Sequence, residues 1–332
     1  MNYLTKNFQQ NILSIKNFTR QDFGYIFRVT EKIMQMNDVE RKQIANGKIL
    51  GYAFYEPSTR TRLSFQAAMY LIGGTSIGIE NGKIGDSNSN SGFFELIKTL
   101  ELNSDVIVFR HPSNGIGNYV EQICTKPMIN GGIGFEEHPT QALLDLFTIQ
   151  KEKGKIDGLK IGLFGDMRYG RTIFSLLRAL AHYNVEVYLI SPPELKITST
   201  FLSTITGIKI KEYFDLKDCI DELDVIYANR IKKERIIEPK RFNDIEQNYS
   251  INLDALKNAK KDLILLHCLP RNKEILPEVD KTKFAKYFQQ AEYGLYVRAA
   301  LLALIINKEF FFITTPTSKK NSKLNKQAEI LS

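Results

Sequence analysis

Apolar and polar positions follow one another along the chain in a pattern that predicts strands alternating with helices. Short apolar runs, typical of buried strands, are followed by polar turns and by longer stretches with helical spacing. The runs that predict strands are 49–54, 75–79, 106–109, 128–130, 159–164, 185–190, 223–227 and 264–266. The stretches that predict helices include 14–36, 93–102, 142–153 and 287–306. This alternation predicts an α/β fold with parallel sheets flanked by helices.

The chain length of 332 residues predicts about two domains. We expect a first domain over residues 1–140 and a second over residues 141–291, each built on a parallel sheet and joined by long interdomain helices. The helix at 142–153 would bridge the domains, and residues 292–312 would return to pack on the first domain. Residues 313–332 form a polar, basic tail in this interpretation.

Composition and charge limit the classes of partner. The net charge is +8, but the basic residues are spread along the chain, so a nucleic-acid partner is not favoured. An anionic small substrate accounts for basic residues at a site equally well. The three cysteines form no CxxC pair and the four histidines form no ligand cluster, which argues against a metal site. Residues 1–10 are polar and no apolar run reaches membrane length, so we expect a cytoplasmic protein without a membrane partner.

The turn between the first predicted strand and the next helix gathers side chains that bind anions. It contains Ser58, Thr59, Arg60 and Thr61, and the helix that follows would end at Gly73-Gly74. A helix N-terminus offers free N–H groups and partial positive charge, and a guanidinium binds two oxygens at once. A capped helix with two solvated arginines is the simpler alternative. Because so many donors exceed what a cap requires, we favour a phosphate site.

Three candidate residues, Arg60, Arg110 and His138, each lie in a segment that follows a predicted strand. Ligands of parallel sheets bind beyond the carboxyl ends of the strands, so these side chains are expected to meet. His138 also lies one helical turn before Gln141, which places both side chains on one face. Taken alone, His138 would more simply be a structural residue at a helix start. The phosphate turn upstream favours a binding role instead.

A segment in the second half nearly spells a nucleotide-binding P-loop, with Gly165, four intervening residues, Gly170, and then Arg171 and Thr172. However, Arg171 stands where the P-loop requires lysine. The predicted strand that would carry an acidic metal ligand ends in His267 instead. We therefore disfavour an NTPase.

Five segments, taken in order, resemble the aspartate/ornithine carbamoyltransferase family: 58–62, 138–149, 165–172, 229–235 and 267–271. The resemblance covers about residues 10–312. It implies attack of an amino group on the carbonyl carbon of carbamoyl phosphate, with release of phosphate and without a metal or organic cofactor. It also implies a role in pyrimidine synthesis and a homotrimer with shared active sites, and it leaves room for a regulatory subunit.

The resemblance assigns roles residue by residue. Carbamoyl phosphate would be bound by Ser58, Thr59, Arg60, Thr61, Arg110, His138, Gln141 and Leu269. Within this set, the catalytic residues would be Arg60, Thr61, Arg110 and His138. The amino acid would be bound by Arg171, Arg230 and Lys232, and the closed state of the domains would be held by Glu56 and Arg235. Fixed donors aimed at the carbonyl oxygen and at the leaving phosphate would stabilise the transition state.

The expected acceptor is aspartate, because the stretch 143–149 resembles the aspartate branch of the family. The candidate acceptor wall contains no acidic residue, since it consists of Arg171, Arg230, Lys232, His267 and Cys268. An ammonium group buried there would be repelled, whereas a dicarboxylate would be attracted. The alternatives are a carbamoyltransferase for another amino acid and a degenerate, non-catalytic homologue that retains the carbamoyl phosphate half-site.

Three positions depart from the aspartate branch. Lys232 stands where a glutamine is expected, and Ser89 stands where the branch carries a lysine in a mobile loop. Lys83 is then the only basic residue of that loop, and Cys268 replaces a proline. We hypothesise that Lys232 replaces the missing loop lysine as the ligand of the side-chain carboxylate.

Overall fold

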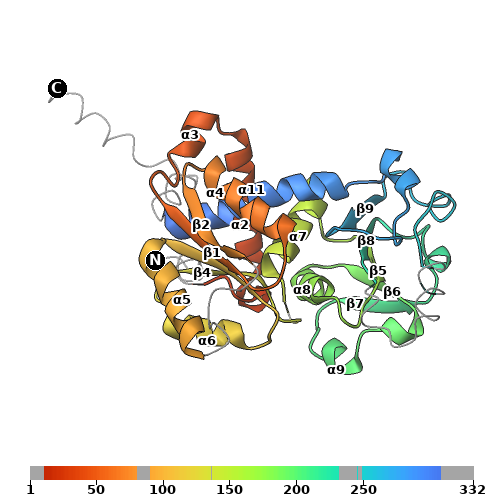
Figure 1. Ribbon diagram of the computed structural model, residues 1–332. Coiled ribbons are helices and arrows are strands. Elements are labelled where there is room, and N and C mark those ends of the chain that lie inside the picture. The colour runs from red at the N-terminus through yellow and green to blue at the C-terminus, as the bar shows by residue number, and fades with distance from the viewer. Residues whose placement is uncertain (1–10, 81–89, 136, 232–244, 246–248, 308–332) are drawn as a thin grey trace.

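The computed structural model describes residues 11–80, 90–135, 137–231, 245 and 249–307. In this part of the chain, two parallel sheets lie next to each other, and each has helices packed on its faces (Figure 1). The predicted α/β fold with two parallel sheets is therefore confirmed. The exact domain boundaries remain predictions.

The first sheet has the strand order β2-β1-β3-β4 and is parallel throughout. Its strands are β1 (Ile49–Phe54), β2 (Thr75–Glu80), β3 (Val106–His111) and β4 (Met128–Ile133). The helices of this half are α2 (Arg20–Gln35), α3 (Asp38–Lys42), α4 (Thr59–Leu71), α5 (Asn90–Asn103) and α6 (Ile116–Ile123). Every residue of β4 is buried, and in β3 only the last residue is not. Continuous apolar runs predict such fully buried strands.

The second sheet has the order β7-β6-β5-β8-β9 and is also parallel. Its strands are β5 (Lys160–Gly165), β6 (Glu186–Ile190), β7 (Lys209–Tyr213), β8 (Val225–Asn229) and β9 (Ile264–His267). The helices α8 (Arg171–Leu180) and α9 (Ser199–Leu202) belong to this half. In both sheets the strand order reverses beside the first strand, at β1/β3 and at β5/β8. Such switch points open a crevice at the carboxyl ends of the strands.

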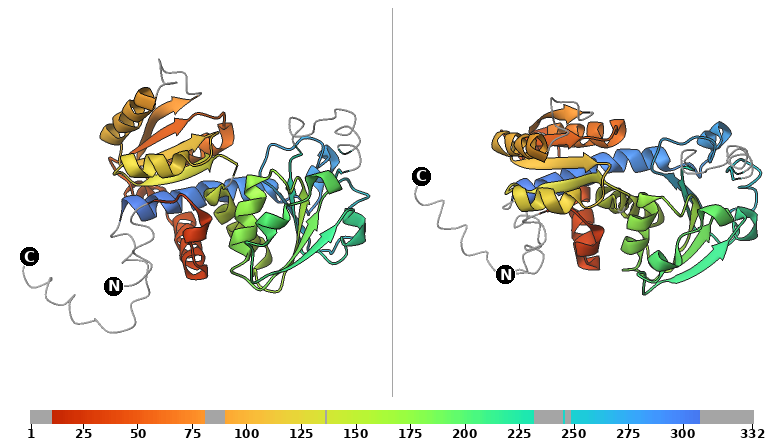
Figure 2. Two further views of the ribbon diagram at one scale, coloured as in Figure 1. Left: turned by 90° about the horizontal axis from the view of Figure 1, so that it is seen from below. Right: turned by 60° about the horizontal axis from the view of Figure 1, so that its bottom comes forward.

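Two long helices lie between the sheets. α7 (Pro139–Lys153) packs against α8 of the second half, and α11 (Tyr287–Ile306) packs against α7, α2 and α4. α11 also contacts β9, and Figure 2 shows it extending from the second sheet back along the first. Residues 308–332, which include the predicted tail, lie outside the described residues.

Four local predictions were wrong or incomplete. The helix predicted at 14–36 begins only at Arg20, because Thr19 forms a capping box with Asp22. β4 continues beyond 130 through Gly131-Gly132. The prediction missed β7, an edge strand with mostly exposed or half-buried residues, and it missed the short helices α3 and α6. Within the described residues, no helix is both long and apolar enough to cross a membrane.

Candidate active site

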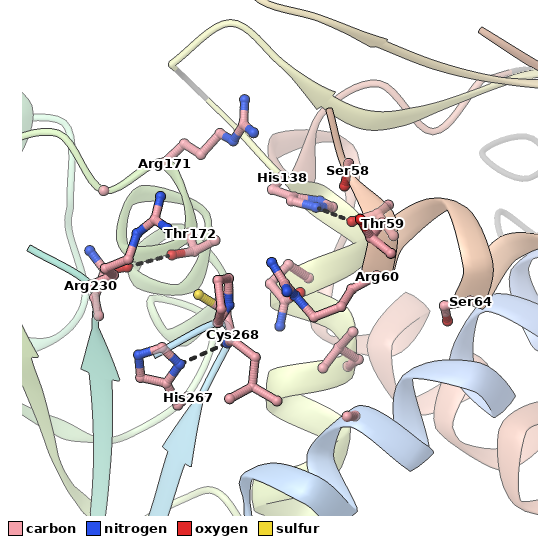
Figure 3. A pocket seen from close by; sticks show the side chains of 18 of the residues that line it. Ser58, Thr59, Arg60, Ser64, His138, Arg171, Thr172, Arg230, His267 and Cys268 are labelled. Carbon is pink, nitrogen blue, oxygen red and sulfur yellow. Dashed lines mark hydrogen bonds between the residues drawn. The ribbon is translucent and has the colours of Figure 1, made fainter. Parts of the chain in front are cut away.

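A cavity of about 550 Å³ lies between the two halves, at the carboxyl ends of both sheets (Figure 3). Residues from the β1–α4 turn, β3 and the start of α7 line one side. Residues that follow β5, β8 and β9 line the other side. The lining includes these predicted site residues: Glu56, Ser58, Thr59, Arg60, Thr61, Arg110, His138, Gln141, Arg171, Arg230 and Leu269. The remaining predicted residues, Lys232 and Arg235, lie outside the described residues, as do Lys83 and Ser89.

The N-terminus of α4 faces this cavity. Ser58 is the N-cap residue, but its side chain makes no capping hydrogen bond, so its hydroxyl is not used by the helix itself. The helix begins at Thr59, and Arg60 and Thr61 also line the cavity. Burial lowers the pKa of Arg60, and the nearby charge of Arg230 acts in the same direction. The geometry matches an anion site built from a helix N-terminus rather than a simple cap.

His138 lies opposite this turn, with its Nε2 3.5 Å from the Thr61 hydroxyl. Burial, followed by the charges of Arg171, Arg110 and Arg298, holds the pKa of His138 well below its usual value. The imidazole is therefore neutral at physiological pH. Its backbone N–H donates to the Ser175 hydroxyl at 2.8 Å, which fixes the start of α7 on α8. A neutral imidazole can donate one hydrogen bond to a polarised oxygen.

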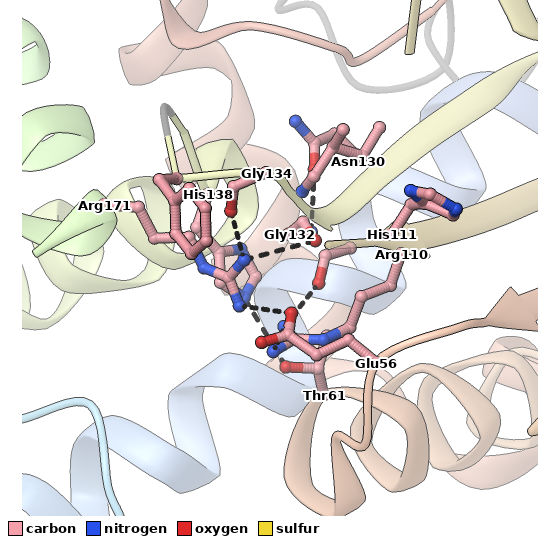
Figure 4. A network of polar contacts seen from close by, with 12 residues as sticks. Glu56, Thr61, Arg110, His111, Asn130, Gly132, Gly134, His138 and Arg171 are labelled. Atoms are coloured by element: carbon pink, nitrogen blue, oxygen red, sulfur yellow. Dashed lines mark hydrogen bonds and ion pairs between the residues drawn. The ribbon is translucent and has the colours of Figure 1, made fainter. Parts of the chain in front are cut away.

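Glu56 connects two arginines from different halves (Figure 4). Its Oε2 lies 3.0 Å from Arg110 Nη2 and 3.1 Å from Arg171 Nη2. Arg171 also donates to the Gly134 carbonyl at 2.6 Å, and Arg110 donates to the Gly131 carbonyl at 3.1 Å. Burial and the neighbouring Arg171 lower the pKa of Arg110 to about 10, while Glu56 opposes this shift. The ion pair therefore links the first sheet to the first turn of α8.

Gly132 makes room for this arrangement. Its φ is +110°, and a Cβ atom there would lie 2.5 Å from Arg110 Nη1 and 3.3 Å from Arg171 Cζ. A side chain at this position would displace both guanidinium groups. The sequence does not indicate this role, since the closeness of Arg171 is a tertiary property.

The opposite wall is held rigidly by polar contacts. His267 Nε2 lies 2.8 Å from Glu274, and its Nδ1 accepts from the Leu269 N–H at 2.7 Å. Leu269 adopts a left-handed backbone conformation with φ +52°, which is uncommon for a residue other than glycine. His267 is thus engaged in holding the loop that presents Leu269 and Cys268 to the cavity. Strained residues held by their surroundings are typical of binding sites.

Several lining residues were not identified from the sequence. Arg298 and Gln290 reach the cavity from α11, and Asp166 reaches it from the turn after β5. Arg298 could have been identified from the sequence, because it is a charged residue inside an otherwise apolar predicted helix. Asp166 is not free for a ligand at Oδ1, which accepts from the N–H groups of Arg168 and Tyr169 at 3.0 and 2.9 Å. No group of three metal-ligating side chains occurs among the residues that the structure describes.

Comparison with known proteins assigns both halves to one family. The family model described as aspartate/ornithine carbamoyltransferase, carbamoyl-P binding domain, matches residues 10–151, and the Asp/Orn binding domain matches residues 157–305. The chain belongs to the aspartate/ornithine carbamoyltransferase family. This result confirms the resemblance inferred from the sequence and removes the P-loop alternative.

Several aspartate carbamoyltransferase catalytic subunits match this chain over nearly their whole length. It is 48% identical to the aspartate carbamoyltransferase catalytic subunit of Nitrosopumilus maritimus, over 92% of this chain and 99% of the relative. The corresponding subunit of Thermococcus kodakarensis is 45% identical over 90% and 97%.

Solved structures show the same fold. The M. jannaschii aspartate transcarbamoylase catalytic subunit superposes with a TM-score of 0.84 at 37% identity, covering 91% of this chain and 99% of that structure. The Trypanosoma cruzi aspartate transcarbamoylase in complex with carbamoyl phosphate and aspartate gives 0.82 at 32% identity, covering 90% and 96%.

Proposed function

We propose that this protein transfers the carbamoyl group of carbamoyl phosphate to the amino group of L-aspartate, giving N-carbamoyl-L-aspartate and phosphate. The observation that carries the proposal is the cavity in which the N-terminus of α4, with Arg60, faces Arg171 and Arg230 from the other half. One wall suits a phosphate and the other suits carboxylates. Membership of the carbamoyltransferase family supports the same reaction.

The α4 turn would bind the phosphate of the first substrate. Free N–H groups at the helix N-terminus, the hydroxyls of Ser58 and Thr59, and the Arg60 guanidinium supply donors for its oxygens. As phosphate leaves, negative charge grows on these oxygens. Donors that are already in place stabilise this charge without reorganisation.

Thr61, Arg110 and His138 would polarise the carbonyl group. When the amine attacks the carbonyl carbon, negative charge develops on the carbonyl oxygen. The Thr61 hydroxyl and His138 Nε2 lie within 3.5 Å of each other, so both can point to one oxygen placed between them and Arg110. Because His138 is neutral, it would serve as a hydrogen-bond donor and not as a second cation. The roles of Gln141 and Leu269 in holding the carbamoyl group remain part of this proposal.

The charge of the cavity favours an acidic acceptor. Among the described lining residues there are five arginines, namely Arg60, Arg110, Arg171, Arg230 and Arg298, against the carboxylates of Glu56 and Asp166. Glu56 is occupied by two of these arginines, and Asp166 Oδ1 by backbone N–H groups. The distal ammonium of ornithine would find no free acidic partner among these residues, whereas the carboxylates of aspartate would find cationic ones.

A panel of acceptors tests the function. Purified protein with carbamoyl phosphate and either aspartate, glutamate or ornithine should form the carbamoylated product from aspartate at least about 100-fold faster than from ornithine, the equivalent of roughly 3 kcal/mol. Omission of carbamoyl phosphate is the control. Efficient ornithine turnover would contradict the charge argument. Absence of any product would favour the non-catalytic alternative.

The proposal extends to the assembly and its setting: a cytoplasmic homotrimer with active sites shared between subunits, a role in pyrimidine biosynthesis and association with a regulatory subunit. Family membership supports it, and curated relatives are named catalytic subunits. Lys232 and Arg235 keep their proposed roles in aspartate binding and domain closure.

A further inference from the structure

Asp145 is a buried carboxylate in the middle of α7, with a relative exposure of 0%. Its Oδ1 accepts from Gln141 Nε2 at 2.8 Å and from Gln290 Nε2 at 2.6 Å. The other end of Gln290, Oε1, accepts from the backbone N–H of His267 at 2.8 Å. One carboxylate oxygen thus joins α7 to α11, and Gln290 extends the connection to the end of β9.

We propose that Asp145 is a positioning residue that holds the Gln141 amide with its oxygen towards the cavity, so that the site selects a substrate bearing N–H groups beside the carbonyl. An ionised carboxylate only accepts hydrogen bonds, so the nitrogen of Gln141 must face Asp145. Gln141 lines the cavity, and Oε1 is then the part of its amide that remains for a ligand. The inference rests on the proposed function, in which the ligand is carbamoyl phosphate.

The Gln290 amide is oriented by the backbone. A backbone N–H can only donate, so His267 forces Gln290 Oε1 towards β9 and Gln290 Nε2 towards Asp145. The position next to Gln290 Nε2 must therefore hold an acceptor. The orientation of the hydrogen bonds is therefore set by two independent constraints, the fixed backbone donor of His267 and the acceptor-only carboxylate of Asp145. Both constraints require the Gln141 nitrogen to face Asp145.

The surroundings of Asp145 determine when it is ionised. Gln141 lies on its own helix, Gln290 and Arg298 face it from α11, Tyr227 from β8 and Cys268 from the turn after β9. Burial raises the pKa of Asp145 to about 7, although its hydrogen-bond donors and Arg298 oppose the shift. At pH 8.5 the carboxylate form predominates, so binding measured there reports the oriented network.

Acetyl phosphate is a suitable probe, because it keeps the phosphate and the carbonyl group but replaces the amide nitrogen by a methyl group. A site with an oriented acceptor penalises this replacement. The preference is the ratio of the dissociation constants of acetyl phosphate and carbamoyl phosphate, measured by calorimetry at pH 8.5. Asp145→Leu keeps the branched shape of the side chain but removes the acceptor. It should lower the preference by about tenfold, the equivalent of one hydrogen bond.

Two further variants separate orientation from general damage. Asp145→Asn should keep the preference within about threefold, because Gln290 Nε2 still requires an oxygen beside it and the same oxygen can accept from Gln141. Thr148→Val lies one turn further along α7, is equally buried and loses only a hydroxyl that bonds the Leu144 carbonyl. It should leave the preference unchanged.

A double variant keeps the proposal testable even if Asp145→Leu does not fold. Gln290→Met alone leaves the acceptor-only carboxylate, and Asp145→Asn alone leaves the Gln290 donor, so each single variant should keep the preference. In the double variant, neither constraint remains, so the introduced asparagine can present either its amide oxygen or its amide nitrogen to Gln141. The preference for carbamoyl phosphate should therefore fall. Loss of preference in Asp145→Asn alone, or its retention in Asp145→Leu or in the double variant, would overturn the proposal.

Calorimetry needs no turnover, so these outcomes are independent of the acceptor assay. A protein that binds carbamoyl phosphate with the expected preference but does not carbamoylate aspartate would refute the proposed function and retain the inference about Asp145. The reverse pattern, normal turnover of aspartate with no effect of Asp145→Leu on the preference, would refute only the inference.

Discussion

Arg60 and Arg62 stand two positions apart in one helical turn, yet they have different surroundings. Arg60 lines the cavity, whereas Arg62 donates to Gln66 at 3.0 Å and pairs with Glu80 at 2.8 Å at the end of β2. Residues two apart on an α-helix point in nearly opposite directions, because each residue rotates the chain by about 100°. The phosphate site can therefore use only one of these arginines.

Substitution of Arg60 tests this assignment. Arg60→Ala should lower kcat/KM for carbamoyl phosphate by at least about 100-fold, or roughly 3 kcal/mol, because a charge-assisted contact to the departing phosphate is lost. The fold should persist, since Arg60 is exposed to the cavity rather than packed in the core. Arg62→Ala is the matched control and should change kcat/KM by no more than about threefold. Equal effects of the two substitutions would refute the assignment of the phosphate site to Arg60.

At the scale of an element, the end of α4 is determined both by the local sequence and by packing against another segment. The sequence predicted a stop at Gly73-Gly74, and the helix ends at Leu71. Gly73 has φ +96°, and a Cβ atom there would lie 1.8 Å from the Lys42 carbonyl oxygen at the end of α3. The glycine therefore ends the helix and also lets another segment approach closely. The second reason cannot be read from the sequence.

Two glycine substitutions separate these reasons. Gly47 has φ +73°, but no atom lies within 4 Å of the position that a Cβ would take, so Gly47→Ala adds only backbone strain. The free energy of unfolding of this variant should fall by about 1 kcal/mol. Gly73→Ala adds a collision with backbone atoms and should cost at least about 2 kcal/mol more. Denaturant unfolding of both variants measures the difference, and equal losses would show that the contact with Lys42 is unimportant.

At the scale of the whole molecule, both sheets place their carboxyl ends around one cavity. Each strand-to-helix turn contributes a few donors, and only the packing of α7 and α11 brings the two sets together. The Glu56 contact with Arg171 crosses the same junction. Relative movement of the two halves would change the distance between the phosphate wall and the carboxylate wall, which suits a reaction that must exclude water.

The proposed assembly can be tested directly. Light scattering should give the mass of three chains, as the family resemblance implies. The polar segment between β2 and α5 suits a connection that completes a neighbouring site. Mixing Arg60→Ala chains with chains whose residues 81–89 are replaced by a Gly/Ser linker should restore activity that neither has alone. A fully active monomer, or no recovery on mixing, would exclude shared sites.

The sequence by itself determined the fold class, the family and many of the polar residues that line the cavity. Strongly apolar strands such as β1, β3 and β8 were predictable because burial on both faces leaves a continuous apolar run. The turn at Ser58 was predictable because a phosphate site needs many donors in a few residues. These are local properties of composition and spacing, and each requires only a short stretch of chain.

The tertiary structure alone decided which side chains contact each other and how they are oriented. It turned Arg60 towards the cavity and Arg62 away, placed Glu56 between Arg110 and Arg171, and brought Gln290 to Asp145 across 145 residues of chain. It also made His138 neutral, because burial and three arginines from separate elements surround it. Contacts between distant segments depend on how α7 and α11 pack the two sheets together. Local pattern does not specify the side-chain contacts that this packing creates, so the orientation of the site follows from the fold.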